Sequence, residues 1–163
     1  MILLYSELAK PLTRYAMNYT RQIHLAEDIV SETFLRATRH CIANSELPAR
    51  AWFYKVTRNI ALDFVRRKEK LQYGDIPETV DFSREANPEA LAEHTEQVET
   101  LAASLSRVPE PYKSVLVLKE YDHLTYAEIA NIMGVSIDNV KVMLFRGRQK
   151  LKELYRREYK DEV

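Results

Sequence analysis

The stretch from Leu124 to Leu154 constrains the fold of this chain more than any other segment, because one helical pattern precedes Gly134 and another follows it. Thr125 can cap the first helix, and Glu128 can reach back to it, as in a capping box. Gly134 can adopt the positive φ that ends a helix. Ser136 can cap a second helix, and the buried side of that helix is predicted to contain Ile137, Val140, Leu144 and Leu151. We therefore predict a short helix, a tight turn and a longer helix.

The other face of the longer helix is polar and basic, and it includes Asn139, Lys141, Arg146, Arg148, Lys150 and Lys152. A helix-turn-helix motif with such a second helix can place its first exposed side chains in the major groove of DNA. An αα-hairpin within a helical bundle produces a similar pattern. The pattern alone leaves both interpretations open.

The rest of the chain favours an all-α fold of two small helical domains. Only three glycines and six prolines occur among 163 residues, and the formal net charge is zero. That charge is unevenly distributed: residues 1–74 carry a net +5, residues 75–99 a net −7 and residues 100–163 a net +2. The acidic segment follows Gly74 and contains Pro77 and Pro88. We predict domains at 1–74 and 89–163, joined by a flexible acidic linker at 75–88.

Two further helices are predicted in the first basic block. The sequence HLAEDIVSETFLRATRHCI places apolar residues at helical spacing, namely Leu25, Ile29, Phe34, Leu35 and Ile42. The loop sequence NSELPAR follows, and AWFYKVTRNIALDFVRRKEK then indicates a second long helix. Trp52, Phe53 and Tyr54 are consecutive, so at least one must point inward, and we expect Trp52 or Phe53 in the core.

Several classes of function find no support in the sequence. The single cysteine, Cys41, cannot form an intramolecular disulfide, and the four histidines do not show metal-ligand spacing. We find no glycine-rich phosphate loop and no nucleophile motif, so we expect neither an enzyme nor a bound cofactor. No apolar stretch is long enough to cross a membrane, so we expect a cytoplasmic protein.

Three phrases in this order resemble the extracytoplasmic-function sigma factors of RNA polymerase, within the sigma-70 family. They are HLAEDIVSETFLRA at 24–37, AWFYKVTRNIALDFVRRK at 51–68 and RVPEPYKSVLVLKEYDHLTYAEIANIMGVSIDNVKVMLFRGRQKL at 107–151. The resemblance implies a transcription initiation factor with two regions. Region 2 would bind the polymerase clamp and read the −10 promoter element, while region 4 would read the −35 element. It also implies three partners: core RNA polymerase, promoter DNA and an anti-sigma factor, which can be membrane-bound.

The resemblance also implies roles for individual residues. Polymerase contact would fall to Asp28, Glu32, Phe34 and Arg36, with core packing as the alternative for Phe34. The −10 element would be read by Asn44, Ser45, Arg50, Arg58, Asn59, Asp63, Arg66 and Arg67. The −35 element would be read by Ser136, Asp138, Asn139, Lys141, Arg146 and Arg148. Relatives often carry a Ser-Arg pair after the lysine, where this chain has Val142 and Met143, so its −35 contacts are expected to be more apolar.

The main rival interpretation is a two-domain helix-turn-helix regulator that acts without the polymerase core. Its first domain would be expected to hold an apolar ligand pocket, whereas this chain offers an exposed loop and a cationic helix there. A helical adaptor protein is a further alternative, although two separate basic blocks would be unneeded for that role.

Overall fold

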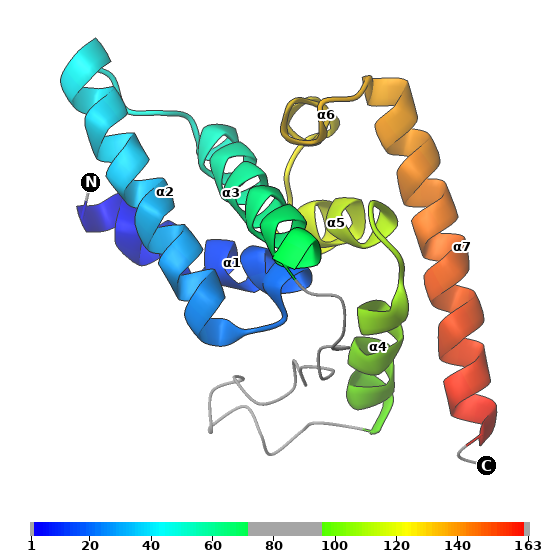
Figure 1. Cartoon of the computed structure of the whole chain (residues 1–163). Coiled ribbons are helices and arrows are strands. Elements are labelled where there is room, and N and C mark those ends of the chain that lie inside the picture. Colours follow the sequence, from blue (N-terminus) through cyan, green and yellow to red (C-terminus); the bar gives the residue numbers. More distant parts are fainter. Residues whose placement is uncertain (1, 72–95, 162–163) are drawn as a thin grey trace.

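A computed structural model describes residues 2–71 and 96–161 of the chain (Figure 1). The amino-terminal half contains α1 (Ile2–Thr20), α2 (Ile23–Asn44) and α3 (Arg50–Leu71). The carboxyl-terminal half contains α4 (Glu96–Arg107), α5 (Tyr112–Leu116), the π-helix η3 (Val117–Tyr121), α6 (Tyr126–Met133) and α7 (Ile137–Asp161). These residues include no strand, so the all-α prediction is confirmed. The linker predicted at 75–88 lies outside the described residues.

The amino-terminal half is a three-helix unit in which α1 packs against both α2 and α3. Aromatic rings fill its centre: Tyr15 of α1 lies 5.5 Å from Tyr54 of α3, and both side chains are fully buried. Phe53 is also fully buried, as expected, and its ring contacts Phe34 of α2. Trp52 is only half-buried, so the inward position next to Phe53 belongs to Tyr54.

The buried stripe of α2 differs from the predicted one. Leu35 and Ile42 were expected with Ile29 and Phe34 on one face, but Leu35 is 54% exposed and Ile42 also faces outward. Ile29 and Phe34 share the inner stripe with smaller side chains, namely Ala26, Val30, Thr33 and Ala37. Thr33 fits there because its hydroxyl bonds to the Ile29 carbonyl and lies 3.1 Å from the hydroxyl of Thr57 on α3. Helical periodicity alone could not show that these small residues allow α3 to approach.

The helix-turn-helix prediction is confirmed at its caps. Thr125 Oγ1 accepts a hydrogen bond from the Glu128 amide, and the Glu128 carboxylate accepts one from the Thr125 amide, which completes the capping box. Gly134 ends α6 with φ 69°. Ser136 Oγ then accepts a hydrogen bond from the Asn139 amide at the start of α7.

One residue of the predicted buried side of α7 is an exception. Val140 and Leu144 are buried and Leu151 is half-buried, but Ile137 is 44% exposed. Ile137 is the first residue of the helix. Gly147 continues the inner stripe, where a Cβ would lie 3.2 Å from Leu116 of α5, so the absence of a side chain lets these helices pack closely.

The two halves also pack against each other. Contacts join α3 to α6 and α1 to α5, and Figure 1 shows α3 lying beside the carboxyl-terminal helices. One continuous cluster of buried apolar residues contains side chains from both halves. The chain therefore adopts a docked arrangement in this structure.

We predict that Gly134→Ala will lower the free energy of unfolding by about 1–2 kcal/mol, because a side chain disfavours the left-handed conformation. No atom lies within 4 Å of the added Cβ, so the cost comes from the backbone alone. Gly134→Asn is the matched control and should cost less, because asparagine tolerates this conformation. Urea unfolding of the full chain measures both values, and equal losses would contradict the backbone explanation.

Candidate nucleic-acid and polymerase interfaces

The residues predicted to read the −35 element lie together on the exposed start of α7. Asp138, Asn139 and Lys141 are exposed, and Lys141 Nζ lies 3.6 Å from Asp138 Oδ1. Ser136 is exposed too, but its hydroxyl already caps the helix. Arg146 is exposed on the next turn. This end of α7 therefore presents amide, ammonium and guanidinium donors to solvent.

Arg148 differs from the other predicted −35 residues because a second element holds it. Its Nε and Nη2 both donate to Glu120 Oε1 on η3. Both side chains are about half exposed, so the pair lies at the surface. A guanidinium bound in this way is oriented, but part of its charge is already neutralised by the carboxylate.

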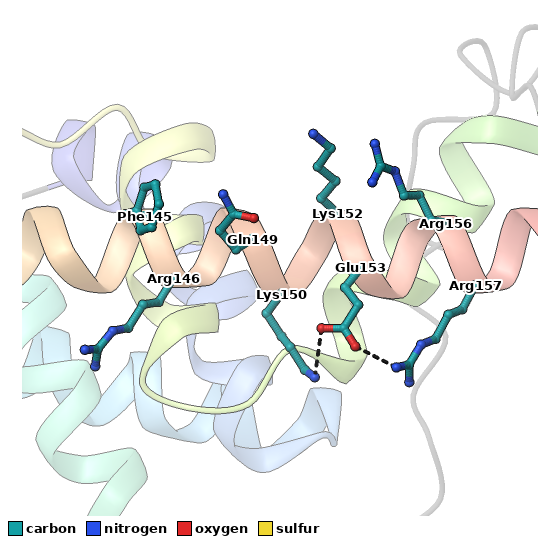
Figure 2. Close-up of a pocket in the computed structure, with 8 residues that line it drawn as sticks. All are labelled: Phe145, Arg146, Gln149, Lys150, Lys152, Glu153, Arg156 and Arg157. Carbon is teal, nitrogen blue, oxygen red and sulfur yellow. Dashed lines mark hydrogen bonds and ion pairs between the residues drawn. The ribbon is translucent and has the colours of Figure 1, made fainter.

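The exposed side of α7 includes residues that the sequence analysis did not name, namely Phe145, Gln149 and Arg156. Phe145 is 64% exposed, and Gln149, Lys152 and Arg156 follow it at spacings of three or four residues. Together with Arg146, Lys150, Glu153 and Arg157 they line a shallow groove along the helix (Figure 2). Figure 2 shows Lys152 and Arg156 pointing to one side of α7, and Lys150 and Arg157 pointing to the other, where both contact Glu153. Val142 lies three residues before Phe145 and is exposed as well. Helical spacing from Val142 could therefore have indicated that Phe145 is exposed.

The predicted polymerase-binding residues do not all face the same way. Asp28 is exposed, and Glu32 accepts a hydrogen bond from Arg36 at 2.8 Å. That hydrogen bond lowers the pKa of the Glu32 carboxyl. Phe34 is only 7% exposed and packs against Tyr5, so its ring is part of the core in this structure, and its contact with the polymerase stays a prediction. Sequence periodicity left these two possibilities open because the ring lies at the edge of the buried stripe.

The predicted −10 loop is exposed between α2 and α3. Asn44 is the last residue of α2, where its side-chain amide donates to the His40 carbonyl. Ser45 follows with φ 57° in the left-handed region. Arg50 begins α3, and its Nη2 donates to the backbone carbonyl of Asp122 in the other half of the chain. At one end of the loop Asn44 bonds within its own helix, and at the other end Arg50 bonds to the other half of the chain.

The remaining predicted −10 residues lie along α3. Asn59, Asp63, Arg66 and Arg67 are exposed, and Arg66 Nη1 lies 3.9 Å from Asp63 Oδ1. Their spacing of three and four residues places them on one side of the helix. Arg58 points elsewhere, because it is half-buried and its Nε has no hydrogen-bond partner in the described structure.

Other kinds of site receive no support from the part of the chain that the structure describes. Within residues 2–71 and 96–161, no cluster of three or more His, Cys, Asp or Glu side chains is arranged to hold a metal ion. No helix in the same residues has the length and hydropathy required to span a membrane.

Comparisons with known proteins match each half of the chain to a protein-family model. The family model for Sigma-70 region 2 matches residues 4–71, and the model for Sigma-70 region 4 matches residues 99–151. The ECF RNA polymerase sigma factor SigM of Bacillus subtilis is 33% identical over 162 residues, which cover 98% of this chain and 97% of SigM. The ECF RNA polymerase sigma factor SigL of Mycobacterium tuberculosis is 30% identical over a region that covers 86% of this chain and 80% of SigL.

A solved structure shares the fold. The sigma factor RpoE in complex with the anti-sigma factor NepR, from Bartonella quintana, has a TM-score of 0.71 over 93% of this chain and 94% of that chain, at 16% identity. The class of protein is therefore a sigma-70-type factor built from regions 2 and 4. Within that class, the chain belongs to the extracytoplasmic-function (ECF) RNA polymerase sigma factors.

We predict that exposed residues of α7 can be changed without loss of the fold. Asn139→Ala should alter the free energy of unfolding by less than about 0.5 kcal/mol, because the side chain is exposed. Leu144→Ala, five residues later on the buried side, should cost about 2–5 kcal/mol. Urea denaturation followed by circular dichroism compares the two, and a large loss in Asn139→Ala would assign that residue a packing role.

Proposed function

We propose that this sigma factor directs core RNA polymerase to promoters by reading the −10 element with residues of α2–α3 and the −35 element with the start of α7. The exposed, capped amino-terminal end of α7 carries most of this proposal, because it presents polar donors where a major groove could receive them. In this role the protein lends sequence recognition to the polymerase and is not itself an enzyme. Its place of action would be the cytoplasm.

The division of labour would follow the proposed domain limits. Residues 1–74 would form region 2, residues 75–88 a linker and residues 89–163 region 4. The ranges matched by the two family models, 4–71 and 99–151, support this division. A tether of this length allows the polymerase to set the distance between the two readers.

At the −35 element, the donors near the start of α7 would contact base edges and Arg146 would contact a phosphate. Asn139 and Lys141 belong to the residue types that read purine edges in the major groove. Val142, which is 45% exposed, would contact thymine methyl groups, and Phe145 one turn later would extend that apolar contact. We therefore expect recognition at some positions through shape and methyl contact in place of hydrogen bonds.

At the −10 element, the exposed loop would receive an everted base, while cations of α3 bind the separated strand. A base that leaves its stack needs a shaped pocket, and Asn44 and Ser45 lie on the exposed side of that loop. Arg66 and Arg67 are exposed two turns beyond Asn59, where they can approach the phosphate backbone. Asp63 would orient Arg66 through their ion pair.

Polymerase contact would use the outward face of α2. Asp28 and the Glu32–Arg36 pair are exposed there, and Leu35 adds an apolar side chain to the same outer surface. An apolar residue beside charged ones is a common composition for a protein interface. We also propose that a membrane-bound anti-sigma factor controls access to these surfaces. The similar structure holds the sigma factor RpoE in complex with the anti-sigma factor NepR.

The first test is run-off transcription with core RNA polymerase on a pooled promoter library, with and without the protein. We expect transcripts that depend on the protein and share two upstream elements at a fixed spacing. If the polymerase gained no start sites while the protein alone bound duplex DNA tightly, the chain would instead act as a regulator without the polymerase core.

We also predict that Arg146→Ala will weaken promoter binding by the holoenzyme about equally for all −35 sequences. A lost phosphate contact should reduce the slope of log affinity against log salt concentration by about 1. Arg157→Ala is the matched control: it removes the same charge from α7, but that arginine is paired with Glu153 further from the turn. A change in sequence preference in Arg146→Ala would instead assign the residue to base recognition.

A further inference from the structure

Glu120 is a half-exposed carboxylate on η3 that binds one of the proposed −35 residues. Arg148 Nε donates to Glu120 Oε1 at 3.1 Å, and Nη2 of the same guanidinium donates to the same oxygen. The two side chains belong to different elements, η3 and α7, and each is about half exposed. An ion pair at such a surface adds little to the stability of a fold, so stability alone is a weak reason for this geometry.

The backbone on both sides of this pair is held in place. Gly147 directly precedes Arg148, and a Cβ at Gly147 would lie 3.2 Å from the Leu116 side chain, so α7 and α5 approach closely beside the pair. On η3 the neighbouring Lys119 donates from Nζ to the Leu124 carbonyl at 3.3 Å. The carboxylate is therefore presented from a fixed backbone, and it can fix the direction of the arginine side chain in turn.

The contact uses only one edge of the guanidinium group. An arginine side chain has N–H donors on Nε, Nη1 and Nη2, all in one plane. Glu120 accepts from Nε and from Nη2, which lie along one edge of that plane. The donors of Nη1 and the second donor of Nη2 are not used by this contact and point away from the carboxylate. Such an edge can bind two oxygens of a phosphate side by side.

Arg148 lies where the rim of a major groove would meet α7. It follows Lys141 by seven residues, which is almost two helical turns, so both side chains lie on the same side of the helix. The rise between them is about 10 Å, close to the groove depth of about 8.5 Å. If Lys141 reaches a base edge at the floor of the groove, Arg148 is therefore level with the phosphates at its rim.

We propose that Glu120 is a positioning residue for −35 recognition, because it holds Arg148 with its Nη1 edge directed at a phosphate of the promoter. The inference rests on the proposed function, since it assumes that the start of α7 enters the major groove of the −35 element. A guanidinium that is already oriented loses less side-chain freedom when it binds. Arg146 lies on the other side of α7, so the two arginines would reach phosphates on opposite walls of the groove.

The sign of the effect on DNA binding distinguishes this role from simple electrostatics. A carboxylate next to DNA repels the phosphates, so its removal should tighten binding if charge alone matters. Its removal should weaken binding if the carboxylate positions Arg148. A pair that only braced η3 against α7 would act differently again, because a tilted α7 would disturb base contacts and change the preference among −35 sequences.

Promoter binding by the holoenzyme, measured over a series of salt concentrations on a promoter recovered from the run-off library, tests the inference. Glu120→Ala should weaken binding by about fivefold. It should also reduce the slope of log affinity against log salt concentration by about 1, because one phosphate contact is lost. The penalty for a mismatched −35 base pair should stay the same. Glu120→Gln, which keeps an acceptor oxygen on a side chain of the same length, should retain most of the affinity.

Glu153→Ala is the matched control. It removes another exposed carboxylate that binds cations of α7, namely Lys150 and Arg157, but these lie further from the turn. We expect it not to weaken promoter binding, because neither cation is directed at the groove by our proposal.

Arg148→Lys tests the same role without altering Glu120. Lysine keeps the positive charge, but it lacks the planar fork that binds a carboxylate on one edge and a phosphate on the other. We expect it to lose nearly as much affinity as Arg148→Ala. In the Arg148→Ala background, Glu120→Ala should cause no further loss. These variants keep the inference testable if Glu120→Ala alone folds poorly.

The wild-type protein in the same titration separates the two proposals. If the wild-type holoenzyme shows no binding that depends on a −35 element, the proposed function is wrong and the positioning role is wrong with it. If the wild type binds specifically while Glu120→Ala binds equally or more tightly, only the positioning role is wrong. The same conclusion follows if Arg148→Lys matches the wild type, or if Glu120→Ala changes the preference among −35 sequences with an unchanged salt slope.

Discussion

The docked structure depends on one buried carboxylate, Asp122, at the end of the π-helix. Its amide closes that helix by donating to the Val117 carbonyl, and its side chain and carbonyl bind Arg14 and Arg50 of the other half. Two residues later, the Leu124 amide donates to the Leu118 carbonyl and directs the chain into the helix-turn-helix. A buried charge is tolerated only when it is paired, so the position of α6 relative to α3 is tied to these two arginines.

The interfaces inferred for this sigma factor lie on surfaces that the core leaves free. Along α7, the buried stripe through Val140, Leu144 and Gly147 packs against the other carboxyl-terminal helices, and the rest of the helix surface retains polar, cationic and exposed apolar residues. Along α3, Phe53 and Tyr54 fill the centre of region 2 while Arg66 and Arg67 remain exposed near the other end. The same helices therefore carry both the packing and the binding surfaces, and it is the helical period that separates them.

The sequence predicted the local elements well because their signals act over a few residues. The Thr125–Glu128 capping box, the glycine stop at Gly134 and the Ser136 cap all form as expected. Predictions that needed knowledge of neighbouring helices were less successful. Leu35, Ile42 and Ile137 were expected inside and are exposed, whereas the ring of Phe34 is buried. The exposed position of Phe145 was missed because an aromatic residue at helical spacing fits a buried stripe equally well.

The sequence by itself determined the all-helical class, the positions of the caps and turns, and the family, since these depend on short-range propensities and on characteristic phrases. Only the tertiary structure decided which side chains Asp122 would pair with and that Arg50 and Lys55 would contact the other half of the chain. Arg14 and Asp122 are separated by 108 positions, and no local pattern links them. Charge pairing across such a distance depends on where the helices come to rest, and that is set by the packing of the whole core.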